Sequence, residues 1–377
     1  MGLLRFYLAI CVVGAHSGEL LPWAVHDGTQ AVQIFFLISG FYMALVLSSG
    51  RYIGPRDFYI SRFLRIFPVT WVVLAGILGV SLVLGLTTHR WFALSPFVSE
   101  PLEKNGALGL ALAAVSNFTL FGQDWVMFLS DESGESLRFT KNFWENKRPL
   151  WHFLLIPPAW SVSLELWFYL LVPTANRLRT FTLVSVVVFL LSARVFAYAF
   201  LGLSHDPWTY RFFLFELSNF FLGMLAFRLY NARFKNLASK YSSTFAFFII
   251  TSVVSLILFC SGTKLVSGCG QRVDGVYCSL LSYPFWCVII ALLFAVSRHS
   301  KYDRAIGELS FPIYLVHFFV ISIVSVAIRA MGIASTSLGL LSAFVSIVVA
   351  ALLYKWCVSP IERMRHDLTL ANKNIAT

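Results

Sequence analysis

Two ionisable side chains near the start of the chain share one face of a predicted apolar helix. Arg5 and His16 are eleven positions apart, which leaves them roughly 20° out of register and roughly 16 Å apart along the axis. Histidine accepts and returns a proton near neutral pH, so we predict that His16 is a general base. Glu19, one turn further on, either orients His16 or is solvated at the helix end. The alternative is that Arg5 only extends its charged group to the membrane interface and that His16 only packs against other helices.

A second candidate site precedes the third long apolar run. Arg62 and Arg65 are three positions apart in an aromatic and aliphatic stretch that leads to Pro68. Paired guanidinium groups bind phosphate bidentately, so we predict that this pair binds a phosphorylated ligand at the membrane boundary. Arg51 and Arg56 add positive charge, although basic residues here also set membrane topology.

A carboxylate is predicted inside a hydrophobic helix that begins after Pro157 and Pro158. Glu165 lies about one and a half turns into this helix. A buried carboxylate needs a partner or a proton, so Glu165 is a proton acceptor, a ligand for a polar substrate, or one half of an ion pair with arginine. Trp160 and Ser161, at the start of the same helix, are candidate substrate contacts.

Tyr314 and His317 lie one turn apart on a late apolar helix. We predict that both contact the substrate, with an internal hydrogen bond or simple packing as the alternative. Ser39 and Gly40 form a small pair in the second apolar run, a pattern typical of close helix packing.

The composition excludes a water-soluble globule. Of 377 residues, 58% are hydrophobic and 12% charged, against about a quarter charged in soluble domains, and the mean hydropathy is +0.76. The net charge of +11 reflects basic loops between apolar runs, as the positive-inside rule expects. Binding to nucleic acid is therefore not expected.

The six cysteines do not predict a disulfide scaffold. Cys260 and Cys287 lie in apolar runs and serve there as small hydrophobic residues. Cys269 and Cys278 could pair if their loop faces an oxidising compartment. No metal site is expected.

Eleven apolar stretches are long enough to be considered as membrane spans. Strict alternation of eleven crossings would put basic loops on both sides. One short stretch, Gly106–Gly122, is therefore predicted to be re-entrant or interfacial. The fold class is an all-α polytopic transmembrane bundle of about ten crossings, with both termini in the cytoplasm and no separate soluble domain in residues 1–377. The stretches are Leu3–Leu21, Gln30–Ser48, Pro68–Leu86, Gly106–Gly122, Ala159–Thr174, Thr180–Phe200, Arg211–Tyr230, Ser242–Cys260, Cys278–Ser297, Glu308–Ile328 and Thr336–Val358.

The order of these motifs resembles the acyltransferase 3 family of integral membrane acyltransferases. The resemblance covers most of the chain. It rests on Leu4-Arg5-Phe6 with His16, the run Phe35 to Phe41, the Arg62, Arg65 and Pro68 run, Trp160 to Glu165 before Phe168 to Leu170, and Leu309-Ser310 with Tyr314 to His317.

The resemblance implies functional roles for Arg5, His16, Arg62 and Arg65. We hypothesise that acyl-CoA, most simply acetyl-CoA, is a co-substrate bound by Arg5, Arg62 and Arg65, with no permanently bound cofactor. His16 then serves as base, or as an acylated intermediate, for transfer to a hydroxyl of a cell-surface carbohydrate or lipid-linked sugar. Glu165 binds the acceptor or polarises His16.

The family also implies a bacterial inner-membrane location, contact with membrane lipids and work beside a polysaccharide assembly complex. Two other classes of function remain open. The chain could be a proton-coupled transporter or flippase of a sugar-lipid or acyl group, with His16 and Glu165 as proton carriers. It could also be a non-catalytic partner in such a complex, whose buried polar residues serve only helix packing.

Overall fold

The computed structural model describes residues 1–18, 28–99, 106–130, 137–145, 148–236, 273–332 and 337–365, with the backbone alone for 273–281. Glu19, the stretch Ser242–Cys260, Cys260, Cys269 and the side chain of Cys278 lie outside this description.

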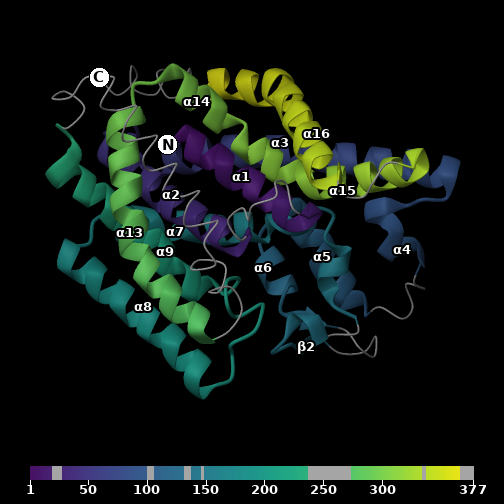
Figure 1. The fold of residues 1–377 in the computed structure, drawn as a ribbon. Helices are drawn as coiled ribbons and strands as arrows, with labels where there is room; N and C mark the ends of the chain where they lie inside the picture. The colour runs from purple at the N-terminus through teal and green to yellow at the C-terminus, as the bar shows by residue number, and fades with distance from the viewer. Residues whose placement is uncertain are drawn as a thin grey trace.

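The described chain is almost entirely helical, which confirms the predicted all-α bundle (Figure 1). The longer helices are α1 (Gly2–Ser17), α2 (Gly28–Ser48), α3 (Pro55–Thr88), α5 (Ala107–Thr119), α7 (Trp160–Ala175), α8 (Thr180–Phe200), α9 (Phe213–Leu229), α13 (Val273–Ser297), α14 (Lys301–Glu308), α15 (Ser310–Met331) and α16 (Leu338–Leu353). Shorter elements are α4 (Ser95–Ser99), α6 (Gln123–Val126), the antiparallel pair β1 (Leu129–Ser130) and β2 (Arg138–Phe139), four 3₁₀ turns (Phe92–Leu94, Phe143–Glu145, Leu150–Phe153, Pro157–Ala159) and π-helical turns at Tyr230–Phe234 and Tyr354–Val358.

Six helices in the described part are long and apolar enough to cross a membrane. They are Gly28–Ser48, Pro55–Thr88, Thr180–Phe200, Phe213–Phe234, Lys301–Met331 and Leu338–Arg365. Helix α1 and the segment Ser282–Ser297 are apolar but shorter. Helix α5, within the predicted re-entrant stretch, has 13 residues and rises only about 20 Å, less than the hydrocarbon core of about 30 Å.

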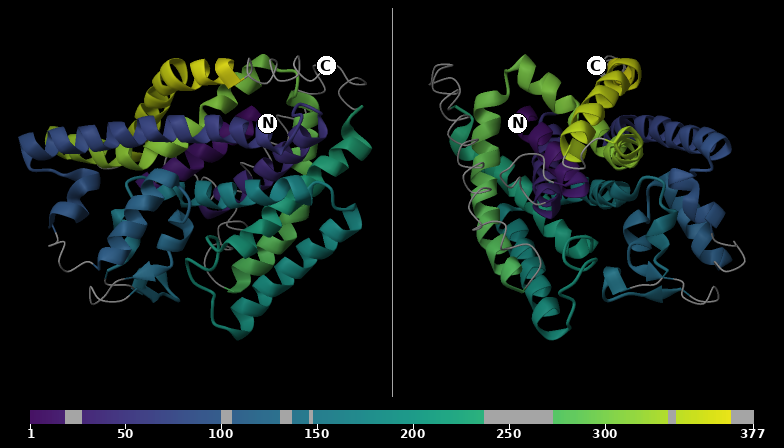
Figure 2. Two further views of the ribbon diagram at one scale, coloured as in Figure 1. Left: turned by 180° about the vertical axis from the view of Figure 1, so that it is seen from behind. Right: turned by 45° about the vertical axis from the view of Figure 1, so that its right-hand side comes forward.

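Helices α1 and α2 lie at the centre of the bundle (Figures 1 and 2). Helix α1 packs on α2, α14, α15 and α16, while α2 packs on α9 and α7. Helices α8 and α13 form one side of the molecule, and α4, α5, α6 and the β1–β2 pair form the other. Helix α3 packs on α15, so the functional residues predicted on α1, α3, α7 and α15 are carried by helices that are linked through α2 and α15.

The crossing of α2 and α9 depends on two glycines. A Cβ atom on Gly40 would lie 1.9 Å from the Phe220 carbonyl oxygen, and one on Gly223 would lie 1.9 Å from the Leu37 carbonyl oxygen. The prediction that Gly40 permits close helix packing is confirmed. Small residues are used in this way where membrane helices approach each other.

Replacing Gly40 by alanine is expected to destabilise the protein by about 1–3 kcal/mol, because the added methyl group forces two backbones apart. The measurement is the melting temperature of the detergent-solubilised protein. Gly79→Ala on α3 is the matched control, since its Cβ would meet no atom within 4 Å. Equal melting temperatures for the two variants would contradict the tight crossing.

Two predicted boundaries were wrong. Helix α3 begins at Pro55, not at Pro68, so Arg62 and Arg65 lie inside a continuous helix and not on a turn before one. The stretch Arg298–Arg304, one of the basic loops expected between apolar runs, contains the start of α14. The first turn of α14 is capped by the Ser300 hydroxyl, which accepts a hydrogen bond from the Asp303 N–H.

The short helix α6 is fixed to α7 by a buried carboxylate. Asp124 accepts hydrogen bonds from Ser163 Oγ at 2.6 Å and from Trp167 Nε1 at 3.4 Å. Burial raises the pKa of Asp124 above its ordinary value, although these donors oppose the effect. The contact holds the segment between α5 and the β1–β2 pair against the helix that carries Trp160, Ser161 and Glu165.

Candidate active site

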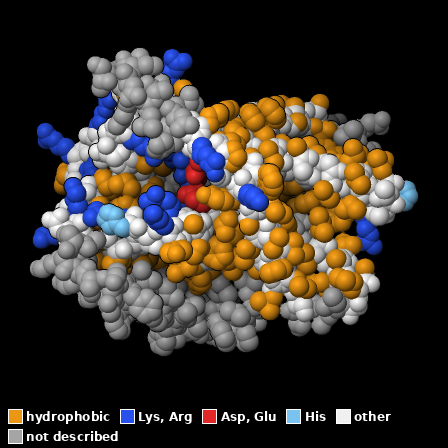
Figure 3. All heavy atoms as spheres, turned by 90° about the horizontal axis from the view of Figure 1, so that it is seen from above, with side chains coloured by type: hydrophobic (Ala, Val, Ile, Leu, Met, Phe, Trp, Pro, Cys, Tyr) orange, Lys and Arg blue, Asp and Glu red, His pale blue; other side chains and the backbone are white. Residues whose placement is uncertain are grey.

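A cavity of about 840 Å³ opens among α1, α2, α3, α7, α14 and α15. Seven arginines and four carboxylates line it, an excess of three positive charges that favours an anionic ligand. Figure 3 shows charged side chains of both signs around a hollow beside a broad hydrophobic surface. The arginines are Arg5, Arg51, Arg62, Arg65, Arg298, Arg304 and Arg365, and the acids are Glu165, Asp303, Glu308 and Glu362.

The predicted arginine pair lies in this cavity together with Arg5. Arg62 is 6% exposed, and its guanidinium donates to Tyr52 Oη at 3.1 Å and lies 5.7 Å from the Phe58 ring centre. Burial would raise the pKa of the Tyr52 hydroxyl, but Arg62, with further help from Arg51, lowers it below its ordinary value. Arg62 is thus held in place by aromatic neighbours.

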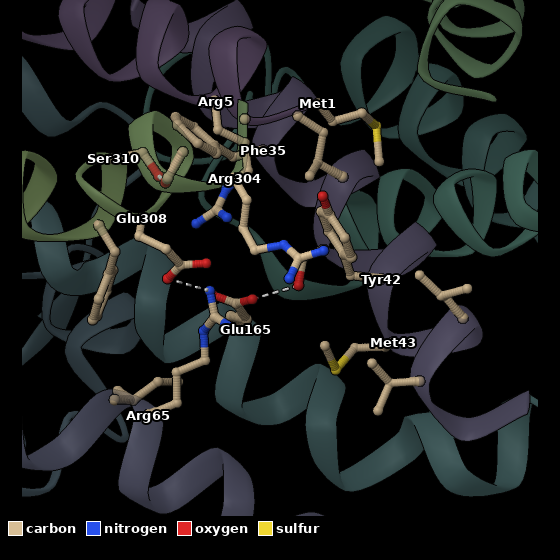
Figure 4. A pocket seen from close by; sticks show the side chains of 18 of the residues that line it. Met1, Arg5, Phe35, Tyr42, Met43, Arg65, Glu165, Arg304, Glu308 and Ser310 are labelled. Carbon is tan, nitrogen blue, oxygen red and sulfur yellow. Dashed lines mark hydrogen bonds and ion pairs between the residues drawn. The ribbon is translucent and has the colours of Figure 1, made fainter. Parts of the chain in front are cut away.

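Arg65 faces Glu308 of α14, with 3.8 Å between Nη2 and Oε2 (Figure 4). This ion pair is long and both side chains are partly exposed, so it contributes little stability. An anionic ligand that entered the cavity would therefore displace Glu308 from Arg65 at small cost.

Glu165 lies in the same cavity, near Arg65 (Figure 4). Its carboxylate accepts hydrogen bonds from the Ser39 hydroxyl and from Tyr169 Oη, the latter at 2.5 Å. Glu165 therefore lies beside Arg65, and the described residues show no contact between Glu165 and His16. Ser39, read from the sequence as a packing residue, is a hydrogen-bond donor here.

Asp303 orients the start of α1 at the edge of the cavity. Its carboxylate accepts hydrogen bonds from the N–H groups of Gly2 at 2.8 Å and Leu3 at 2.9 Å. A carboxylate at this position satisfies free donors and complements the helix dipole. The interaction fixes the helix that carries both Arg5 and His16.

Ser161 and Tyr314 also line the cavity. Their hydroxyl oxygens are 2.7 Å apart, and Tyr314 Oη donates to the Pro158 carbonyl at 2.8 Å. The Tyr314 ring is 6.4 Å from that of Phe35, another lining residue. The cavity therefore reaches from the arginines to a pair of hydroxyl groups.

His317 connects this pair of hydroxyls to His16. The imidazole of His317 is 5.6 Å from the Tyr314 ring and 5.4 Å from the His16 ring. His16 lies on the last turn of α1 and its side chain is exposed, while His317 is fully buried. Neither histidine lines the cavity, and the ring contacts relate His16 to Tyr314 only through His317.

Trp160, the remaining predicted contact, is 4% exposed and does not line the cavity. Its ring lies 4.6 Å from the Arg211 guanidinium and 5.3 Å from the Tyr210 ring. Arg211 is held by Asp206 through Nε at 2.7 Å and Nη2 at 3.1 Å. This buried cation was not singled out from the sequence.

A second missed cluster lies between α2, α8 and α9. Arg194 and Glu216 are 3.3 Å apart, and Glu216 also accepts hydrogen bonds from Gln33 at 3.1 Å and Asn219 at 2.6 Å. All are outside the cavity lining. Because the predicted spans already contained both charged residues, the rule that marked His16 could have found this pair. The pair fastens helices and does not face the cavity.

The helices and this cavity define a multi-pass membrane protein with a positively charged chamber that extends to the hydroxyl groups of Ser161 and Tyr314. A family model described as an acyltransferase domain, that of the acyltransferase 3 family, matches residues 1–356, so the chain belongs to this family. The protein is therefore a membrane acyltransferase, as its motifs predicted. No curated sequence and no solved structure matches the chain.

Proposed function

We propose that the protein transfers an acyl group, most simply acetyl, from acyl-CoA to a hydroxyl of a cell-surface carbohydrate or lipid-linked sugar. The observation that carries this proposal is the cavity, which has Arg5, Arg62 and Arg65 at one part and Ser161 and Tyr314 at another. CoA has the matching chemistry, since it is highly anionic at one end and carries a neutral thioester at the other.

The length of α1 supports an extended donor. Arg5 and His16 are separated by roughly 16 Å of helix rise. An extended pantetheine arm can bridge such a separation, with its phosphates on the arginines and its thioester directed toward the imidazoles. Glu165, which we predicted from the sequence to bind the acceptor or polarise His16, lies beside this proposed path. We now propose that it accepts a hydrogen bond from a pantetheine amide.

In the proposed reaction, His16 takes the proton of the acceptor hydroxyl as its oxygen attacks the thioester carbonyl carbon. The C–S bond then breaks, and His16 returns the proton to the CoA thiolate. The products are an ester and free CoA, so atoms and charge balance. Ser161 and Tyr314 contact the reacting groups, Trp160 supports them, and holding both substrates beside His16 lowers the entropic barrier.

The proposed orientation of the protein in the membrane follows from the location of the acyl donor. Acyl-CoA is made in the cytoplasm, so the arginine part of the cavity faces that side, in agreement with the positive-inside rule. His16, exposed at the far end of α1, then meets an acceptor that enters from the opposite side of a bacterial inner membrane. A polysaccharide assembly complex is a natural source of this acceptor.

The test is transfer of radiolabel from acetyl-CoA into polysaccharide and lipid fractions of membranes that contain the protein. Label is expected in wild-type membranes and not in membranes with His16→Ala at equal protein level. Succinyl-CoA in parallel reports the acyl preference. No incorporation from any acyl-CoA, or full incorporation by His16→Ala, would overturn the proposal and favour transport or a non-catalytic role.

A further inference from the structure

His317 has one ring nitrogen engaged and the other free of any partner among the described residues. Its Nδ1 lies 2.7 Å from the Tyr314 carbonyl oxygen of the preceding turn. Its Nε2 is buried and has no hydrogen-bond partner in the described parts of the chain. A buried polar atom without a partner is costly, so a group that satisfies Nε2 during function is expected.

The engaged nitrogen determines the tautomer of His317. A carbonyl oxygen only accepts hydrogen bonds, so Nδ1 must carry the proton. The ring is fully buried with no anion among its described contacts, and burial of an unpaired charge is unfavourable. The neutral ring therefore presents Nε2 as a hydrogen-bond acceptor.

His16 is a hydrogen-bond donor next to the His317 ring. The two ring centres are 5.4 Å apart with an interplanar angle of 33°, a separation at which a ring N–H of one imidazole can reach a ring nitrogen of the other once the exposed His16 side chain rotates. The Phe318 ring, 5.5 Å from that of His16 in a T-shaped contact, packs on the same imidazole.

We propose that His317 is a positioning residue that accepts a hydrogen bond from one nitrogen of His16. This contact holds His16 in the tautomer whose other nitrogen is unprotonated and free to take the acceptor proton. The inference rests on the proposed function, because it gives His317 a role only if His16 is the base. It replaces direct substrate contact as the role of His317.

Two isosteric variants separate this role from packing. The amide of His317→Gln lies where Nε2 lies and can accept through its oxygen, whereas that of His317→Asn lies near Nδ1 and leaves the Nε2 position empty. We expect His317→Asn to lower kcat at least about tenfold, a part of the usual general-base contribution, with KM for acetyl-CoA unchanged. His317→Gln is expected to recover most of the lost rate.

A double variant tests whether His317 acts through His16. In a His16→Ala background, His317→Asn is expected to cause no further loss of the residual rate, because interacting residues are not additive. Wild-type kcat in His317→Asn, equal impairment in both single variants, or additive losses would each overturn this inference. Failure of the proposed function would appear separately, as no acyl transfer by the wild-type protein.

Discussion

Replacement of His16 by alanine is expected to lower the rate of acyl transfer by about 100- to 10,000-fold, the usual contribution of a general base. Binding of acetyl-CoA is expected to be unchanged, because the side chain lies at the last turn of α1 and does not line the arginine-rich cavity. Single-turnover transfer and equilibrium binding of labelled acetyl-CoA measure the two quantities in detergent-solubilised protein.

The control for this variant is a histidine remote from the cavity. His89 is exposed at the C-cap of α3 with φ of 57°, a left-handed conformation that asparagine also adopts. His89→Asn should therefore transfer acyl groups at the wild-type rate. Equal rates for His16→Ala and the wild type, or loss of donor binding in His16→Ala, would contradict the assignment of His16 as base.

Incubation with labelled donor and no acceptor separates the two proposed uses of His16. A general base leaves the protein unlabelled, whereas nucleophilic catalysis leaves an acyl group on the imidazole. Label that accumulates on the wild-type protein and is absent from His16→Ala would show that His16 is a nucleophile.

Much of the helical framework could be predicted from the sequence, because the hydrocarbon core requires long apolar runs whatever the topology. The predicted range 180–200 is that of α8, and the predicted start and end of α7 differ from the structure by one residue. The start of α3 was missed because its first turns are polar and aromatic. Gly54 and Pro55, an N-cap followed by proline at N1, were the signal that could have placed it.

The side chains that meet in and beside the cavity could be predicted only in part from the sequence. Spacing relates residues within one helix, so it predicted that Arg62 and Arg65 act as a pair. It cannot show that Glu165 meets Ser39, or that His317 lies beside His16 some 300 residues away, since both depend on how helices rotate about their own axes. Arg304 was missed because the basic residues between spans were interpreted only as topology signals, and Glu308 was missed because it was taken only as the start of a predicted span.

Loss of Arg65 is expected to weaken binding of acetyl-CoA by about 10- to 100-fold, because a hydrogen bond to a charged group contributes about 1.5–3 kcal/mol. Arg65→Lys should be intermediate, since lysine keeps the charge and loses the bidentate geometry. Arg56→Ala is the matched control on the same helix, because Arg56 is exposed and lies outside the cavity lining. Equilibrium binding of labelled acetyl-CoA gives the dissociation constants.

Replacement of Glu308, the neighbour of Arg65, is expected to change acetyl-CoA affinity in the opposite direction. Glu308 competes with phosphate for Arg65 across the 3.8 Å ion pair, so Glu308→Gln is expected to tighten acetyl-CoA binding, and added salt should reduce the gain. S-acetyl-pantetheine carries no phosphate, so its transfer should be almost equally slow in Arg65→Ala and in the wild type. If Arg65→Ala impairs both donors equally, Arg65 supports the fold and does not bind phosphate. If it impairs acetyl-CoA alone, the arginines are the phosphate site. The thioester must then lie deeper in the bundle, toward the imidazoles.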